Sequence, residues 1–172
     1  MNTIVILCGG IKCGKTTTLK GFFKVKSVPS PKSYIEWKLD NKIVCAVYFG
    51  SPQEQEPFCN VEQVNENIKN RIAKCEDNTK DESYIVLIPF TMCGNRKGEK
   101  INRNCILEPI RKLEEKFQVF IIYLRKTNIR NLTEKDALMA QVASLTIQTT
   151  KQDYDKSVEL EKFLREVVMK SN

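Results

Sequence analysis

Residues 9–16 constrain the fold of this chain more than any other segment. They read Gly-Gly-Ile-Lys-Cys-Gly-Lys-Thr and fit the pattern G-x-x-x-x-G-K-[ST] at every fixed position. An apolar run precedes them at residues 4–8, and a run compatible with a helix follows at residues 17–20. A strand, a glycine-rich turn and a helix in that order form the context in which such a turn binds phosphate. The sequence therefore predicts a phosphate-binding loop, although a chance glycine turn between strand and helix would give the same local pattern.

The chemistry of this loop comes from its backbone and from two side chains. Glycines let successive backbone N–H groups turn toward phosphate oxygens, and the positive N-terminal end of the helix adds to the attraction. The Lys15 ammonium can reach the β- and γ-phosphates of a nucleotide, and the Thr16 hydroxyl can bind Mg²⁺. The residues expected to contact the nucleotide here are Gly9, Gly10, Ile11, Lys12, Cys13, Gly14, Lys15, Thr16 and Thr17.

Length and hydropathy favour one soluble domain that spans residues 1–172. The chain has 172 residues, 41% of them hydrophobic, which suits a single domain with a sizeable core. No apolar run approaches the roughly 20 residues of a membrane-spanning helix. The first strand starts directly after Met1 and Asn2, so we expect no signal peptide and no N-myristoyl group, and the last residues carry no prenylation box. These features predict a cytoplasmic protein without a lipid anchor.

The cysteine and histidine content excludes several kinds of chemistry. Seven Cys residues are present, an odd number, and no two are spaced as C-x-x-C. Several lie in apolar runs, so we expect buried free thiols in a reducing compartment rather than a disulfide framework or a zinc site. The chain contains no His, which removes imidazole acid–base catalysis, Ser-His-Asp triads and most zinc sites.

The net charge of +7 allows two interpretations. An excess of Lys and Arg can mark a protein that binds nucleic acid or an anionic membrane surface. Here the lysines are spread along the whole chain and interleaved with Glu, as in residues 112–116, and no basic block stands out. This pattern favours a generally charged, solvated surface over a nucleic-acid-binding one.

The order of the remaining segments predicts the fold class. Two runs typical of strands, at 34–39 and 43–49, are too close together for a helix between them, so they should form an antiparallel hairpin. We expect an α/β fold: a three-layer P-loop NTPase sandwich with a six-stranded, mostly parallel sheet, one antiparallel edge hairpin, and helices on both faces. The later helices are expected at about 61–75, 107–117, 133–142 and 158–168, and the later strands at 84–90, 119–124 and 145–148.

Two capping boxes support the starts of these helices. Asn60 is placed to cap the helix that follows it, with Gln63 three residues later as its partner. Thr133 and Asp136 have the same spacing before the helix expected to reach about residue 142.

With this order of elements, nearly the whole chain resembles a small GTPase of the Ras/Arf/MglA-like group of P-loop GTPases. The resemblance rests on chain length, on the intact phosphate loop and on the antiparallel strand pair directly after the first helix, which is that family's signature within P-loop proteins. It implies a molecular switch that binds GTP or GDP with Mg²⁺, hydrolyses GTP slowly and interacts with a protein regulator or effector. Residues 26–33 and 50–60 would be the loops that the γ-phosphate orders.

The family's switch threonine, which closes on Mg²⁺, has only serines as counterparts. Ser27, Ser30 and Ser33 are available, and Ser33 is the candidate metal ligand beside Thr16. An ordinary Ser/Pro linker is the alternative interpretation of this stretch.

The D-x-x-G-Q motif of the family is also altered. Residues 48–58 are similar to the F-G-T-P-G-Q-E-R-F form of the motif but lack an Asp at the strand end. Two registers are open. One places Pro52 at the motif glycine and Gln53 at the water-orienting glutamine. The other places Gln53 and Glu54 at these two positions, with an extra residue that makes Gln55 a further candidate. The resemblance thus implies Gln53, Glu54 and Gln55 as candidate catalytic residues together with Lys15.

The base-reading motif N-K-x-D has its counterpart in residues 125–128, which read Arg-Lys-Thr-Asn. Lys126 matches the motif, whereas Asn128 replaces the Asp that accepts hydrogen bonds from guanine. An amide offers one acceptor oxygen and also carries donors, so the preference for guanine should weaken. Thr150 and Lys151 loosely match the family's S-A-K motif and complete the candidate base-binding set.

Two other functions remain open from the sequence. A nucleotide or small-molecule kinase can begin with the same loop, and Arg125 and Arg130 could then clamp a phosphate, although the hairpin argues against that class. A catalytically weak interaction module that uses a GTPase-like body to bind a partner is the third possibility.

Overall fold

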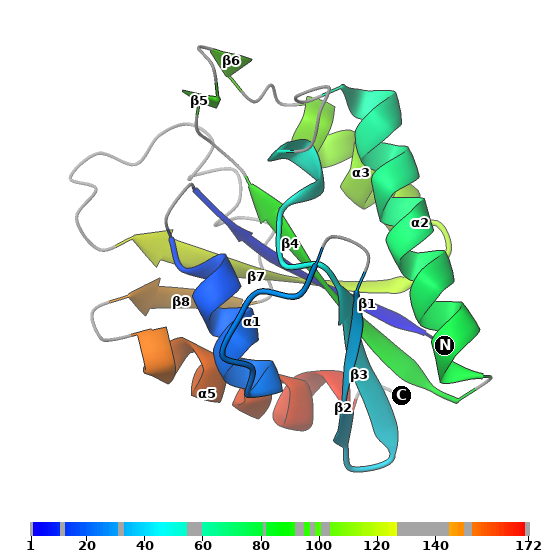
Figure 1. Ribbon diagram of the computed structural model, residues 1–172, viewed down its shortest axis with the longest axis vertical. Helices are drawn as coiled ribbons and strands as arrows, with labels where there is room; N and C mark the ends of the chain where they lie inside the picture. The colour runs from blue at the N-terminus through cyan, green and yellow to red at the C-terminus, as the bar shows by residue number, and fades with distance from the viewer. Residues whose placement is uncertain are drawn as a thin grey trace.

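The computed structural model describes residues 2–10, 13–30, 33–54, 60–80, 82–91, 95–96, 99–100, 104–126, 145–149 and 153–170. Its main sheet has six strands in the order β2-β3-β4-β1-β7-β8. Neighbours from β3 to β8 in this order are parallel, and β2 pairs antiparallel with β3 at one edge (Figure 1). The strands of this sheet are β1 (Thr3–Gly9), β2 (Tyr34–Leu39), β3 (Lys42–Val47), β4 (Tyr84–Thr91), β7 (Gln118–Lys126) and β8 (Leu145–Thr149). The expected mixed, mostly parallel sheet with one antiparallel pair is confirmed.

Helices cover both faces of this sheet (Figure 1). Alternate residues of β1 divide the core into two clusters, because successive side chains of a strand point to opposite faces. Ile4 and Ile6 pack with α2 and α3, whereas Val5 and Leu7 pack with α1 and α5. The helices are α1 (Lys15–Phe23), α2 (Val61–Thr79), α3 (Asn104–Glu114) and α5 (Asp153–Phe163), which continues as a π-helical turn (Leu164–Val168). The structure also contains a 3₁₀ turn (Pro52–Glu54) and a small sheet formed by β5 (Asn95–Arg96) and β6 (Glu99–Lys100).

The start of α2 is the one that its sequence predicts. Asn60 Oδ1 accepts a hydrogen bond from the backbone N–H of Gln63 at 2.9 Å, which satisfies one of the unpaired donors of the first turn. The side chain of Gln63 does not complete a reciprocal box, because its Nε2 donates to Asn67 Oδ1 at 3.1 Å. The second expected box, Thr133 with Asp136, and the helix expected at 133–142 lie outside the described residues.

The pairing of β3 with β4 stops before the end of the sheet, and Pro89 lies in the part of β4 beyond it. The ladder between these strands stops at the pair Cys45 and Val86, whereas β4 stays paired with β1 as far as Thr91. Pro89 has no N–H to donate to a neighbouring strand, so it suits the part of β4 that has lost its β3 neighbour. The chain after β3 can therefore turn in against the end of β4, and this turn contains Ser51 and the 3₁₀ turn.

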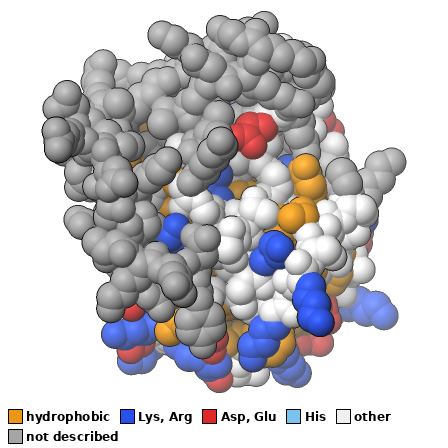
Figure 2. Space-filling view, turned by 60° about the vertical axis from the view of Figure 1, so that its left-hand side comes forward, with side chains coloured by type: hydrophobic (Ala, Val, Ile, Leu, Met, Phe, Trp, Pro, Cys, Tyr) orange, Lys and Arg blue, Asp and Glu red, His pale blue; other side chains and the backbone are white. Residues whose placement is uncertain are grey.

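The surface charge is mixed in sign. Arg165 pairs with Asp40 at 2.7 Å and with Glu161 at 2.9 Å, which links the C-terminal helix to the β2–β3 turn. Figure 2 shows Lys and Arg side chains next to Asp and Glu side chains along the lower border of the described surface. This arrangement agrees with the interpretation of the +7 charge as a generally charged surface.

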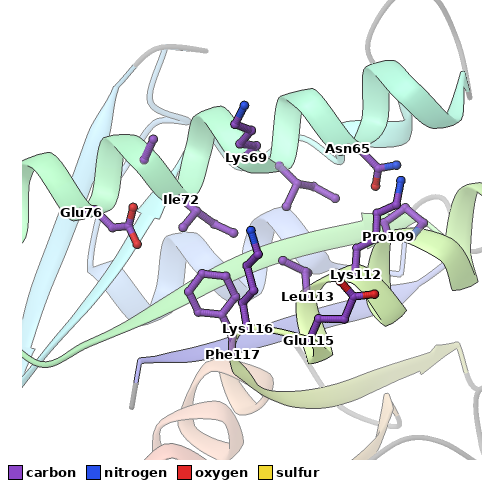
Figure 3. A pocket seen from close by; sticks show the side chains of 12 residues that line it. Asn65, Lys69, Ile72, Glu76, Pro109, Lys112, Leu113, Glu115, Lys116 and Phe117 are labelled. Carbon is purple, nitrogen blue, oxygen red and sulfur yellow. The ribbon is translucent and has the colours of Figure 1, made fainter.

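A groove of about 550 Å³ runs between α2 and α3. Figure 3 shows Lys116 and Phe117 facing Ile72 of α2 across this groove. All of its lining residues come from α2, α3 and residues 115–117, so it is separate from the loop at residues 9–16.

The described cysteines are buried thiols outside any disulfide, as the sequence predicts for Cys8, Cys13, Cys45, Cys75 and Cys105. Over the same described ranges, no cluster of three or more Cys, Asp or Glu side chains could hold a metal ion. None of the helices in this part of the chain combines the length and the hydropathy that a membrane crossing requires.

Candidate functional site

The loop at residues 9–16 lies where an open parallel sheet favours a ligand site. β1 sits between β4 and β7, so the chain passes from one side of β1 to the other when it leaves β4 and forms β7. Ligands bind outside the carboxyl ends of the strands at such a change of direction. The loop follows the carboxyl end of β1 and leads into α1 (Figure 1).

Lys15 is folded back over the loop that precedes it. Its Nζ donates to the carbonyl oxygens of Gly9 at 3.0 Å and Gly10 at 2.8 Å, and it lies 3.7 Å from Cys13 Sγ. Only 8% of the residue is exposed. A buried ammonium held against backbone carbonyls is a fixed positive charge at the mouth of the loop, which is suited to an anionic ligand.

Two glycines give the loop its shape. Gly14 has a φ of 90° at the N-terminal end of α1, a conformation that residues with a Cβ rarely adopt. At Gly9 a Cβ would lie 2.2 Å from Cys13 Sγ and 2.9 Å from the carbonyl oxygen of Leu124 on β7. Gly14 is thus required by its backbone conformation, and Gly9 by the close approach of the loop to the sheet.

Cys8, near the end of β1, carries an uncharged thiol. Cys8 is fully buried, and this burial raises the pKa of its thiol to about 12, although the positive charge of Lys15 opposes part of the shift. Cys8 is therefore neutral near pH 7 and acts as a small apolar side chain in the core.

A lysine from α5 also reaches the loop. Lys156 is 5% exposed, and its Nζ donates to the carbonyl oxygen of Cys13 at 2.9 Å. This bond turns that carbonyl toward α5 and joins the last helix to the loop. No pattern in the sequence points to Lys156, because its proximity to residue 13 depends on how α5 packs against α1.

Thr16 connects the loop to the segment that follows β3. Its Oγ1 donates to the carbonyl oxygen of Phe49 at 3.3 Å. Phe49 is fixed in turn, because its buried ring stacks on Phe23 of α1 at a centroid distance of 5.7 Å. A change in the hydrogen bonding of Thr16 would therefore directly affect the position of the chain after β3.

Gln53 is part of the protein interior. It is 0% exposed, its Nε2 donates to the carbonyl oxygen of Cys105 at 3.3 Å, and its Oε1 accepts from the N–H of Thr91 at 3.4 Å. The Cys105 carbonyl is available because Pro109, four residues later in α3, has no N–H to donate to it. In this arrangement the Gln53 amide joins β4 to α3 and is not directed at solvent.

Glu54 is placed differently from its neighbour. It is only partly buried, and its Oε1 lies 2.8 Å from Thr91 Oγ1. Ser51 Oγ lies 2.7 Å from the same hydroxyl. Thr91 and Ser51 are buried, and neither was singled out from the sequence. The position of Thr91 as the first polar residue after the apolar run 84–90 was the available signal.

Arg71 on α2 fixes the chain just before these residues. Its Nη1 donates to the carbonyl oxygen of Gly50 at 2.8 Å, and its guanidinium lies 5.6 Å from the centre of the Tyr48 ring. The residue is 5% exposed, and burial lowers its pKa to about 10, although Tyr48 acts in the opposite direction. Its Nη2 is buried and has no hydrogen-bond partner within the described structure.

Ser33 lies at the same edge of the sheet as the loop but belongs to a local turn. Because β2 is antiparallel to β3, its first residues are level with the carboxyl end of β3, and the carbonyl of Ser33 accepts from the N–H of Tyr48 at 3.3 Å. Its Oγ is 2.7 Å from Ser30 Oγ.

The structure describes only part of the remaining candidate set. Thr17 is an exposed residue of α1, and Lys126 ends β7 opposite Thr149 of β8. The parallel strands β7 and β8 therefore end at the same edge of the sheet. Ile11, Lys12, Gln55, Asn128, Thr150 and Lys151 lie outside the described residues.

Comparisons with known proteins give low similarity. No protein-family model matches the chain, and no curated protein matches it. Among solved structures, a de novo designed protein of the PLOOP2X3 fold has a TM-score of 0.47 at 12% identity, covering 100% of this chain and 98% of the design. A crystal structure of a probable GTP-binding protein, engB, has a TM-score of 0.43 at 14% identity, covering 98% of this chain and 99% of that one. At these scores the function has to be argued from the residues of this chain.

Proposed function

We propose that this chain binds a nucleoside triphosphate as its Mg²⁺ complex on the loop at residues 9–16 and hydrolyses it slowly, as a molecular switch. The observation that carries the proposal is the buried Lys15 ammonium, held over the loop between the end of β1 and the start of α1. A fixed cation, a helix N-terminus and a loop whose glycines permit close approach together suit a chain of phosphates. GTP is the proposed nucleotide because of the resemblance of the chain to small GTPases.

The residues of the loop fit Mg²⁺ bound together with a substrate. Mg²⁺ keeps several waters and takes few protein ligands when phosphate oxygens supply the rest. The Thr16 hydroxyl, at the first turn of α1, would be one such protein ligand, and Ser33 is the proposed second one. When bound, the ion neutralises charge on the phosphates.

The chain's own residues would act mainly by position and charge. Lys15 would hold the β- and γ-phosphates, and Lys156 would keep the Cys13 carbonyl turned aside. Of the candidate water-orienting residues, Glu54 is better placed than Gln53, because its carboxylate is partly exposed whereas the Gln53 amide is enclosed. Without an arginine from a partner, rates on the order of 10⁻⁴ to 10⁻² s⁻¹ are expected for this class of switch.

Calorimetry with GTP and ATP in the presence and absence of Mg²⁺, followed by single-turnover phosphate release, tests the proposal. We expect Mg²⁺-dependent binding and slow release of one phosphate per bound triphosphate. Failure to bind either nucleotide at millimolar concentration would contradict the proposal. Tight binding without release would support the interaction module, and transfer of the phosphate to an added acceptor would support a kinase.

Replacing Asn128 by Asp tests the assignment of the base-reading loop. A carboxylate can accept from both guanine donors, and a charge-assisted hydrogen bond contributes about 1.5–3 kcal/mol. Asn128→Asp should therefore tighten GTP binding by roughly 10-fold to 100-fold and leave ATP binding nearly unchanged. Competition binding with both nucleotides measures this. Asn131→Asp adds the same charge nearby and serves as the control. Unchanged GTP affinity in Asn128→Asp would show that residues 125–128 do not read the base.

A further inference from the structure

The end of β4 lies directly beside the start of the phosphate loop. In the ladder between β1 and β4, Thr91 is the partner of Gly9, which is the first residue of the loop. Thr91 is 0% exposed, so both its backbone and its hydroxyl need partners inside the protein. Because β3 has left β4 by this point, those partners cannot come from the β3 backbone.

Residues from the segment after β3 supply these partners. The N–H of Thr91 donates to Gln53 Oε1 at 3.4 Å. Its Oγ1 is 2.7 Å from Ser51 Oγ and 2.8 Å from Glu54 Oε1. One threonine therefore holds Ser51, Gln53 and Glu54, and it does so next to Gly9.

Thr91 Oγ1 is the donor in both hydroxyl contacts. A hydroxyl carries one proton, and an ionised carboxylate can only accept. A hydrogen bond to a charged acceptor is the stronger of the two, so the proton of Thr91 goes to Glu54.

We propose that Thr91 is a positioning residue that holds the Glu54 carboxylate beside the phosphate loop, where Glu54 orients the attacking water. This inference rests on the proposed function. Gln53 fixes the backbone of Thr91. In the proposed hydrolysis the water oxygen forms a bond to the γ-phosphorus, the bond from that phosphorus to the bridging oxygen breaks, and the water proton leaves to Glu54 or to a phosphate oxygen. The products are the diphosphate and inorganic phosphate.

Thr91→Val tests this proposal, because it keeps the shape of the side chain and removes its hydroxyl. Misplacing a catalytic group by about 1 Å can cost 10²-fold in rate, so we expect single-turnover GTP hydrolysis to slow by about 10-fold to 100-fold. GTP affinity should change by less than about 2-fold, because Thr91 does not contact the phosphates in the proposal. Thr91→Ser keeps the hydroxyl and should recover most of the rate.

Thr3→Val is the matched control. Thr3 is also 0% exposed and its Oγ1 also reaches a side-chain acceptor, Gln118 Oε1 at 3.5 Å, but it lies at the opposite end of β1. A general loss of stability from removing a buried hydroxyl should appear in both valine variants, whereas the loss of rate should appear only in Thr91→Val.

A double-mutant cycle with Glu54→Gln separates positioning from a purely structural role. If Thr91 acts through Glu54, Thr91→Val should slow hydrolysis in the wild type and add little in the Glu54→Gln background. Equal effects in both backgrounds, or a wild-type rate in Thr91→Val, would overturn the inference while leaving nucleotide binding intact. Binding with no hydrolysis by the wild type would also overturn it. Failure of the proposed function is a different result, namely that the wild type binds no triphosphate.

Discussion

Lys15→Ala should weaken binding of Mg²⁺–GTP by at least about 100-fold, because the ammonium held over the carbonyls of Gly9 and Gly10 would be lost. Each hydrogen bond from a charged donor to a phosphate contributes about 1.5–3 kcal/mol, and Lys15 is expected to make two. The fold should persist, because the variant removes the desolvation cost of a buried charge but leaves the Gly9 and Gly10 carbonyls without this donor, and these effects partly cancel. Calorimetry for affinity and thermal denaturation for stability measure the two outcomes.

Lys20→Ala is the matched control for this prediction. Lys20 lies on the same helix, in its last turn, so its loss changes the net charge equally but leaves the loop untouched. Its affinity for GTP should stay within about 3-fold of the wild type, because the field of a surface charge is screened within about 10 Å at 0.1 M salt. A Lys15→Ala protein that binds Mg²⁺–GTP as tightly as the Lys20→Ala protein would show that the loop does not bind phosphate.

Gly9→Ala should lower both stability and triphosphate affinity. The added Cβ would meet Cys13 Sγ at 2.2 Å and the Leu124 carbonyl oxygen at 2.9 Å. The cysteine side chain can move, but the carbonyl belongs to the sheet, so the loop has to shift. Overpacking of this kind typically costs 1–3 kcal/mol, and we expect about 2 kcal/mol in the free energy of unfolding measured with urea.

A second substitution at Cys13 tests the cause of this loss. The Gly9→Ala/Cys13→Ala variant removes the Sγ atom and leaves the contact with Leu124. Gly9→Ala should therefore cost less stability in the Cys13→Ala background than in the wild type. Gly9→Ala with wild-type stability would mean that the loop does not approach the sheet as closely as described.

The sequence predicts those features that depend on neighbours along the chain. Three residues between two strand-like runs force a hairpin, and the pattern at residues 9–16 places a loop between β1 and α1. Asn60 caps α2 because the bond to Gln63 spans one helical turn. Each of these interactions joins residues a few positions apart, so the sequence pattern is sufficient to predict them.

The contacts of Gln53 and Thr91 could not be predicted from neighbours along the chain. The family motif predicts that Gln53 orients a water molecule. In the structure its amide instead lies between the Thr91 N–H and the Cys105 carbonyl. Two prolines explain this placement: Pro89 lies where β4 has lost its β3 neighbour, and Pro109 frees a carbonyl in α3. Both prolines are visible in the sequence, but which groups fill the space beside them depends on elements that are distant along the chain.

By itself, the sequence determined the fold class, the hairpin and the loop that carries Lys15, because periodicity, capping and glycine spacing act over short distances. Only the tertiary structure decided that Thr91 lies beside Gly9, that it holds Glu54, and that Lys156 reaches the Cys13 carbonyl. Thr91 and Glu54 are 37 positions apart in the sequence, and Lys156 and Cys13 are 143 positions apart. Strand order and helix packing bring such residues together, and both result from burying apolar faces of the whole chain, which no local pattern encodes.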